Sequence, residues 1–324
     1  MANVRTNYYD AHLLTTHYLG YLFERILYLL LSVSHFQIDT QSHSPMFSAL
    51  NKLSELQQRI IAAIIGASLI ISCVWWNEWS YFTIFFLICM LTQLEFYKLV
   101  DLDGNQTLKY FGTMNGMIIY TLAFLVQKYN TETKYFYLVF VFLSFAYFIK
   151  LYHFVRRDLK PFMNIAFTFL GVLYVAVPFA LLHSVVFIDG AYTWHILLGT
   201  IFIIWASDTG AYFSGRKFGK RKLFFSVSPK KTWEGSLGGA ALAVAVAVGF
   251  SFYSPELSLW QWVSISVVTV IAGTYGDLVE SLFKRSIRIK DSGNTIPGHG
   301  GFLDRFDSLL LAAPFIAAFV NLLR

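Results

Sequence analysis

The sequence predicts an all-α integral membrane protein with about nine transmembrane helices. Of its 324 residues, 56% are hydrophobic and only 14% are charged, whereas soluble domains usually carry about a quarter charged residues. This excess of apolar surface needs lipid rather than water around it. Tyrosine and tryptophan residues stand at the ends of many apolar segments, where an interfacial aromatic belt would place them.

Nine apolar segments are the candidate membrane spans. They cover residues 60–76, 81–94, 110–126, 135–149, 165–182, 195–213, 235–252, 260–283 and 302–323. Several lie near the lower end of the ~17–25 residues that a spanning helix needs. The two cysteines, Cys73 and Cys89, lie inside these segments and predict neither a disulfide framework nor a metal site.

The spans divide the chain into three parts. Residues 1–45 form an N-terminal extension of unclear role, whose one apolar run is too short to cross a bilayer. Residues 46–190 form an N-terminal transmembrane region with five spans, and residues 191–324 form a C-terminal catalytic transmembrane region with four. Met46 precedes the first basic segment and is an alternative start of translation.

Basic residues gather on one side of the membrane when the spans alternate in direction. If the segment before the first span is cytoplasmic, 20 Lys and Arg residues fall inside and only Lys128, Lys134 and Arg324 fall outside. The positive-inside rule therefore predicts a cytoplasmic N-terminus and an odd number of spans. Because the basic residues punctuate apolar segments, no nucleic-acid partner is expected.

Ionisable residues inside the last four spans are the candidate chemistry. The first five spans have almost none. Asp208 lies in the sixth span, Asp277 and Glu280 lie in the eighth, and Asp304 and Asp307 open the ninth. Because a bilayer penalises such side chains, those that remain are usually functional or paired.

The spacing of these acids places them near one membrane face. Asp277 precedes the basic pair Lys284-Arg285 by seven residues, about 10 Å along a helix at ~1.5 Å per residue. Glu280 shares a helix face with Asp277, and Asp307 shares one with Asp304. Each acid alone could be a cap or a helix-packing ion pair, but carboxylate clusters also hold Mg²⁺ beside phosphates.

Two basic segments near the same face offer groups that bind phosphate. Ser228, Lys230, Lys231 and Thr232 precede a helix that starts at a glycine, and phosphates suit hydroxyls, ammonium groups and helix N-termini. The second segment adds Lys284, Arg285, Lys290, His299 and Arg305. A lone histidine is often structural, and the basic cluster at residues 216–222 is interpreted as a topological anchor.

Acids for a metal and bases for phosphate, placed at the boundary of lipid and cytosol, predict transfer of a phosphoryl or nucleotidyl group to or from a lipid. The sequence contains no Walker loop, kinase signature or acyl-transfer elbow. A cation-coupled transporter is an alternative, because intramembrane acids also line ion paths. Acids near one face and the lack of an internal repeat disfavour it.

Three segments resemble the phosphatidate cytidylyltransferase (CDP-diacylglycerol synthase) family. Residues 281–307, with Ser281-Leu282-Phe283-Lys284-Arg285 and Pro297-Gly298-His299-Gly300-Gly301-Phe302-Leu303-Asp304-Arg305-Phe306-Asp307, look like the signature of that family. Residues 207–212 and 228–235 are similar to further elements of it. The likeness covers residues 205–310 or so, while the N-terminal half agrees in architecture only.

The resemblance implies a Mg²⁺-dependent reaction of CTP with phosphatidate that gives CDP-diacylglycerol and pyrophosphate. It implies a multi-pass protein of the bacterial inner membrane with its active site facing the cytoplasm, and leaves a homodimer open. A CTP-dependent lipid kinase, which shares these substrates but delivers the γ-phosphate, is the nearer alternative.

The resemblance also implies roles for the candidate residues. Asp277 and Asp304 would hold the Mg²⁺, with a monovalent cation such as K⁺ as an option alongside. The catalytic residues would be Asp277, Asp304, Lys231 and Asp208. The substrate-binding residues would be Ser228, Lys230, Thr232, Glu280, Lys284, Arg285, Lys290, His299, Arg305 and Asp307.

Overall fold

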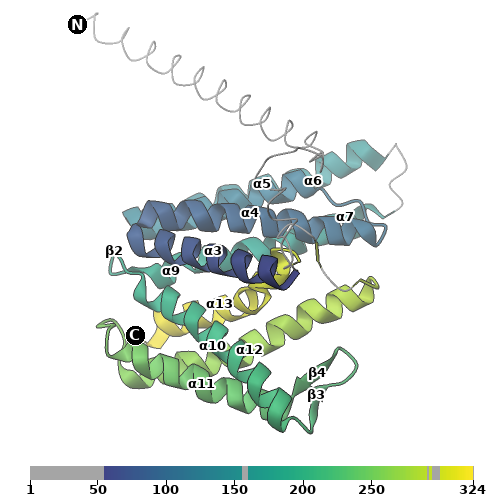
Figure 1. The fold of residues 1–324 in the computed structure, drawn as a ribbon. Coiled ribbons are helices and arrows are strands. Elements are labelled where there is room, and N and C mark those ends of the chain that lie inside the picture. Colours follow the sequence, from purple (N-terminus) through teal and green to yellow (C-terminus); the bar gives the residue numbers. More distant parts are fainter. Residues whose placement is uncertain (1–54, 155–159, 290–291, 294–299, 324) are drawn as a thin grey trace, which may run out of the picture. The chain divides into compact units, whose positions relative to one another are not determined.

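The computed structural model describes residues 55–154, 160–289, 292–293 and 300–323. This part of the chain consists of helices and two short antiparallel hairpins (Figure 1). The helices of the N-terminal region are α3 (Glu55–Trp76), α4 (Glu78–Leu102), α5 (Lys109–Tyr129), α6 (Phe136–Phe154), α7 (Pro161–Gly171), α8 (Val177–Leu181) and α9 (His183–Val186). Those of the C-terminal region are α10 (His195–Phe218), α11 (Trp233–Ser251), α12 (Leu259–Ser286) and α13 (Leu303–Leu323).

Each of the nine predicted spans coincides with a helix or a run of helices, which confirms the all-α membrane fold. Among the described residues, seven helical segments are long and apolar enough to cross a membrane: Glu78–Leu102, Thr133–Leu151, Pro161–Val186, His195–Phe218, Trp233–Ser251, Leu259–Ser286 and Leu303–Leu323. The apolar part of α3, Ile60–Trp76, is shorter. Helix α5 matches the third predicted span but does not belong to these seven.

Contacts between loops and helix ends agree with spans that alternate in direction. At one end of these helices, Lys128 at the end of α5 pairs with Glu78 at the start of α4, with Nζ 2.9 Å from Oε1. Near the other end, Lys150 of α6 donates to the carbonyl oxygen of Gln106 in the α4–α5 loop at 2.6 Å. This is the arrangement that the alternating charge pattern requires.

The fifth predicted span is an irregular run of helices. A π-helical turn, Val172–Ala176, joins α7 to α8. The N–H of Val177 bonds to the carbonyl oxygen of Val172, five residues back, and the next residue, Pro178, has no N–H to offer. A proline next to a π-helical turn is a recognised cause of bending in a helix.

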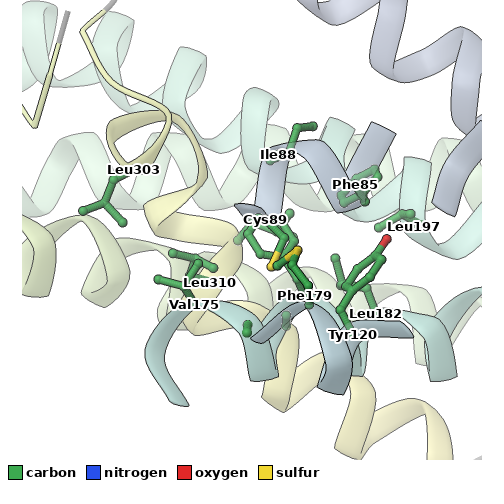
Figure 2. Close-up of a cluster of buried hydrophobic side chains, with 14 of the residues drawn as sticks. Phe85, Ile88, Cys89, Tyr120, Val175, Phe179, Leu182, Leu197, Leu303 and Leu310 are labelled. Carbon is green, nitrogen blue, oxygen red and sulfur yellow. The ribbon is translucent and has the colours of Figure 1, made fainter. Parts of the chain in front are cut away.

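A buried core joins the N-terminal helices to α13. Figure 2 shows side chains of α4, α5 and α8 beside two leucines of α13. The labelled members of this cluster from these helices are Phe85, Ile88, Cys89, Tyr120, Phe179, Leu303 and Leu310, all buried. The first residue of α13, Leu303, is completely buried there.

Helices α10 and α11 cross in close contact at their glycines. A Cβ atom added to Gly239 would lie 2.6 Å from the backbone oxygen of Ser207, and one added to Gly210 would lie 2.8 Å from the backbone oxygen of Gly238. Small residues allow helix backbones in membranes to approach this closely. The crossing holds the start of α11 against the part of α10 that carries Asp208.

Candidate active site

A cavity of about 330 Å³ lies among the last four long helices. It lies between the middle of α10, the start of α11 and the middle of α12, with Ser308 of α13 in its wall. Its polar lining residues are Ser207, Asp208, Tyr212, Lys230, Lys231, Thr232, Ser236, Thr269, Thr274, Asp277 and Ser308. The sequence-predicted residues Asp208, Lys230, Lys231, Thr232 and Asp277 therefore share one cavity.

A β-hairpin carries the basic side of this cavity. Strand β3 (Lys222–Phe224) pairs antiparallel with β4 (Ser228–Thr232), and β4 leads into α11 (Figure 1). Successive side chains of a strand point to opposite faces, and here Lys230 is exposed while Lys231 is half-buried. The Lys231 Nζ atom lies 2.6 Å from Oδ2 of Asp277 on α12.

Thr232 ends the strand and begins the helix. Its side-chain oxygen accepts a hydrogen bond from the N–H of Gly235 at 3.2 Å, which is the geometry of an N-cap. This cap fixes the direction in which α11 leaves the hairpin. Thr232, predicted to bind substrate, therefore lines the cavity and also has a structural role.

Three carboxylates meet beside the cavity. Asp277, Glu280 and Asp307 each offer an oxygen, and these oxygens all lie within 4.8 Å of one another. The lack of a side chain at Gly276 allows α12 and α13 to approach closely here. A Cβ atom added to Gly276 would lie 2.5 Å from the backbone oxygen of Asp307. Glu280 is 1% exposed and Asp307 is 8% exposed.

One oxygen of Glu280 is an orphan in the described part of the chain. Its Oε1 atom is buried and has no hydrogen-bond partner there. A buried carboxylate oxygen without a partner is costly, and three carboxylates packed together also repel one another. A divalent cation would relieve both costs, so the donor set fits a hard metal ion such as Mg²⁺.

Lys284 connects this group to the start of α13. Its Nζ atom lies 2.6 Å from Oε2 of Glu280 and 2.6 Å from Oδ1 of Asp304. Asp304 also accepts the N–H groups of Ser292 and Gly301, each at 3.0 Å. A carboxylate at a helix N-terminus that accepts backbone N–H groups is well placed electrostatically.

The geometry thus favours a different acidic group from the pair predicted from the sequence. Asp277 and Asp304 were expected to hold the metal together. In the structure the oxygens of Asp304 face Lys284 and two backbone N–H groups, and the three clustered acids are Asp277, Glu280 and Asp307. The metal-binding role of the predicted pair stays a prediction.

Other sequence-predicted residues lie elsewhere. Ser228 opens β4, while Arg285 and Arg305 are exposed, and none of these three lines the cavity as far as the described residues define it. Arg285 donates to the carbonyl oxygen of Ile289 at the end of α12 at 3.1 Å. Lys290 and His299 lie outside the described residues.

Sequence reasoning missed the hydroxyl groups that line the cavity. Four of them belong to Ser207, Ser236, Thr269 and Ser308. The Oγ1 atom of Thr269 is buried without a hydrogen-bond partner in the described part of the chain. Thr269 lies eight residues before Asp277 on the same helix. This spacing of about two helical turns could have identified it as a neighbour of Asp277 on one helix face.

Sequence reasoning also missed Glu95 on α4. Its Oε2 atom accepts the N–H of Leu303, the first residue of α13, at 2.8 Å. The second predicted span ended at residue 94, one residue before this acid, whereas α4 continues to Leu102. The apolar residues Phe96, Leu99 and Val100 are the signal that could have extended the span.

The fold and the site define a multi-pass membrane protein with a cavity lined by lysines, carboxylates and hydroxyls among its last four long helices. A model of the cytidylyltransferase family matches residues 57–323. The chain belongs to this family.

Two curated relatives of the chain are named phosphatidate cytidylyltransferase. The chain is 48% identical over 129 residues to a phosphatidate cytidylyltransferase of Haemophilus influenzae, a match that covers 38% of the chain and 45% of the relative. It is 37% identical over 175 residues to one of Staphylococcus haemolyticus, covering 54% of the chain and 66% of the relative. The chain thus spans between about half and two thirds of the length of these relatives.

Proposed function

We propose that the protein is a phosphatidate cytidylyltransferase, a nucleotidyltransferase of phospholipid biosynthesis that makes CDP-diacylglycerol and pyrophosphate from CTP and phosphatidate. The observation that carries the proposal is the orphan oxygen of Glu280 within the three-acid group, beside the Lys231–Asp277 ion pair. Clustered carboxylates bind hard metal ions, and lysine ammonium groups bind phosphates. The names of the relatives supply the substrates.

Asp277, Glu280 and Asp307 would hold a Mg²⁺ ion, and a monovalent cation such as K⁺ is an option alongside. When bound, Mg²⁺ would neutralise charge on the phosphates and allow two anionic groups to approach each other. The acids alone would repel a triphosphate. This is why the residues of this chain need a cation before the site can accept CTP.

The reaction itself is an exchange at one phosphorus atom. An oxygen of the phosphatidate phosphate forms a bond to the α-phosphorus of CTP. The bond from that phosphorus to the oxygen bridging to the β-phosphorus breaks, and pyrophosphate leaves. The attacking phosphate is already anionic, so positioning and charge neutralisation carry the catalysis and no strong general base is needed.

Lys231 and Lys230 are the cavity's cations for these phosphates. Lys231 is held at the cavity wall by Asp277 and by a 3.5 Å contact to the carbonyl oxygen of Thr274. An incoming phosphate oxygen would compete with these two partners for the ammonium group of Lys231. Lys284 is 9% exposed and tied to Glu280 and Asp304, so it holds the acids in place.

The membrane orientation is part of the same proposal. The cavity would open on the side of the membrane to which the charge pattern assigns the cytoplasm. The 20-to-3 division of Lys and Arg residues supports this side. The bacterial relatives support a cell membrane as the location.

Purified protein in detergent tests the proposal. Phosphatidate and CTP are supplied with Mg²⁺ or with a chelator, and lipid products are separated. CDP-diacylglycerol should appear only with Mg²⁺. A well-folded preparation that makes no CDP-lipid under these conditions would rule the proposal out.

A further inference from the structure

Glu95 is an acid buried within a membrane helix, far in sequence from the other acids. It lies in α4, inside the segment Glu78–Leu102, and is 7% exposed. An ionisable group at such a place is costly unless it has a specific partner. The backbone group that the Glu95 carboxylate binds indicates the role of this residue.

The carboxylate of Glu95 holds the first turn of α13. The N–H groups at the start of a helix have no partner inside the helix, and Leu303 is the first residue of α13. Glu95 Oε2 accepts the Leu303 N–H at 2.8 Å, across 208 residues of sequence. A negative charge at this helix end is favourable.

The second oxygen of Glu95 lies against the turn that precedes α13. A Cβ atom added to Gly301 would collide with Glu95 Oε1 and with Ser292 Oγ. Asp304 also binds this turn, because it accepts the N–H of Gly301 at 3.0 Å. Two carboxylates, one from each half of the protein, therefore fix one turn.

The chain of contacts continues from this turn into the acidic group. Asp304 binds Lys284, and Lys284 binds Glu280, with 2.6 Å for each ion pair. Asp307 stands one helical turn beyond Asp304 on α13, so the start of α13 sets the distance of Asp307 from Glu280. A displacement of Leu303 would therefore change the positions of acids on both α12 and α13.

Helix α4 also contacts α12 directly. The ring of Phe96, the residue after Glu95, stacks on Phe283 of α12 with centroids 5.5 Å apart and an interplanar angle of 20°. Adjacent residues of α4 therefore hold the start of α13 and the end of α12. This is the arrangement needed to fix these two helices relative to each other.

We infer that Glu95 is a positioning residue that sets the first turn of α13 and thereby the geometry of the Asp277, Glu280 and Asp307 group. Glu95 is not among the described residues that line the cavity. It makes the N-terminal helices a part of the site, which otherwise belongs to the last third of the chain. The activity arm of its test rests on the proposed function.

The test compares Glu95→Ala and Glu95→Gln with Glu78→Gln. The control residue lies on the same helix and forms an ion pair with Lys128 near its opposite end. Binding of Mn²⁺ to each purified protein is measured by electron paramagnetic resonance, without substrate. Turnover per folded molecule, the KM for CTP and the melting temperature are measured in parallel.

We expect Glu95→Ala to weaken Mn²⁺ binding and to lower kcat by about tenfold, which equals ~1.4 kcal/mol, with a much smaller change in KM for CTP. Glu95→Gln keeps an acceptor oxygen for Leu303 and should recover part of both losses. Glu78→Gln should leave Mn²⁺ binding and kcat unchanged. If the alanine variant does not fold, the glutamine variant carries the test.

Normal Mn²⁺ affinity and normal kcat per folded molecule in the Glu95 variants, with only a lower melting temperature, would overturn the inference. A wild-type protein that binds Mn²⁺ but makes no CDP-diacylglycerol would overturn the proposed function instead. In that case the Mn²⁺ comparison alone decides the role of Glu95.

Discussion

Lys231 on a β-hairpin and Asp277 on a membrane helix form an ion pair, with Nζ 2.6 Å from Oδ2. The two side chains are 26% and 38% exposed, so the pair faces the cavity rather than the protein interior. Ion pairs that are open to solvent contribute little to stability. Because both residues line the cavity, we expect the pair to serve the proposed reaction rather than stability.

Replacement of Lys231 by alanine should lower kcat/KM by at least about tenfold, or ~1.4 kcal/mol of transition-state stabilisation. Lys222 provides the matched control because it lies on the paired strand of the same hairpin but is exposed and does not line the described cavity. Lys222→Ala should cost much less. Equal losses in a steady-state assay would show that the two lysines are not distinguished by the cavity.

Asp277→Asn should cut turnover by about a hundredfold, the scale of losing an electrostatic contact at a reacting centre. It should also raise the Mg²⁺ concentration needed for residual activity, because one ligand loses its charge. Asp304→Asn removes the charge that binds Lys284 and the start of α13, so it should lower the melting temperature as well.

Mg²⁺ titrations and thermal melts of both variants separate these roles. The structure predicts the larger shift in Mg²⁺ dependence for Asp277→Asn. A larger shift for Asp304→Asn would restore the predicted pair of Asp277 and Asp304 as the metal site. Near-normal turnover with unchanged Mg²⁺ dependence would remove either acid from the site.

Gly239→Ala should destabilise the protein by about 1–3 kcal/mol, the usual cost of overpacking. The added Cβ would lie 2.6 Å from the backbone oxygen of Ser207 and would push α10 from α11. Gly249, on the same helix, has no atom within 4 Å of an added Cβ among the described residues. Gly249→Ala is therefore the control, and equal melting temperatures for the two variants would contradict the close crossing.

Cysteine labelling in right-side-out vesicles tests the orientation. Phe225, after β3, is 73% exposed and Tyr253, after α11, is 80% exposed. In a background without Cys73 and Cys89, a membrane-impermeant maleimide should label Tyr253→Cys and spare Phe225→Cys. The opposite pattern would reverse the proposed topology.

The sequence was sufficient for the helices and for the charged residues of the cavity, for physical reasons. A membrane span must be long and apolar, and acids inside it are conspicuous, so Asp208 and Asp277 could be found without a structure. The groups that the acids contact could not be predicted in this way. Whether Asp304 faces a metal or Lys284 depends on how α12 and α13 cross, and spacing along one helix does not determine that.

Glu95 could not be identified from the sequence for a different reason. The predicted span ends at residue 94, whereas α4 continues to Leu102, so Glu95 falls just outside the predicted segment. Its contact with Leu303 crosses 208 residues, a separation that local patterns cannot report. Thr232 was assigned to substrate because a hydroxyl before a helix suits both phosphate binding and helix capping.

The group that the protein transfers from CTP to the lipid distinguishes a nucleotidyltransferase from a lipid kinase. CTP labelled at the α-phosphorus and CTP labelled at the γ-phosphorus are each incubated with purified protein, phosphatidate and Mg²⁺. For a phosphatidate cytidylyltransferase, the α-label should enter the lipid and the γ-label should leave in pyrophosphate. Entry of the γ-label into the lipid, with release of CDP, would instead identify a CTP-dependent lipid kinase and contradict the proposed function.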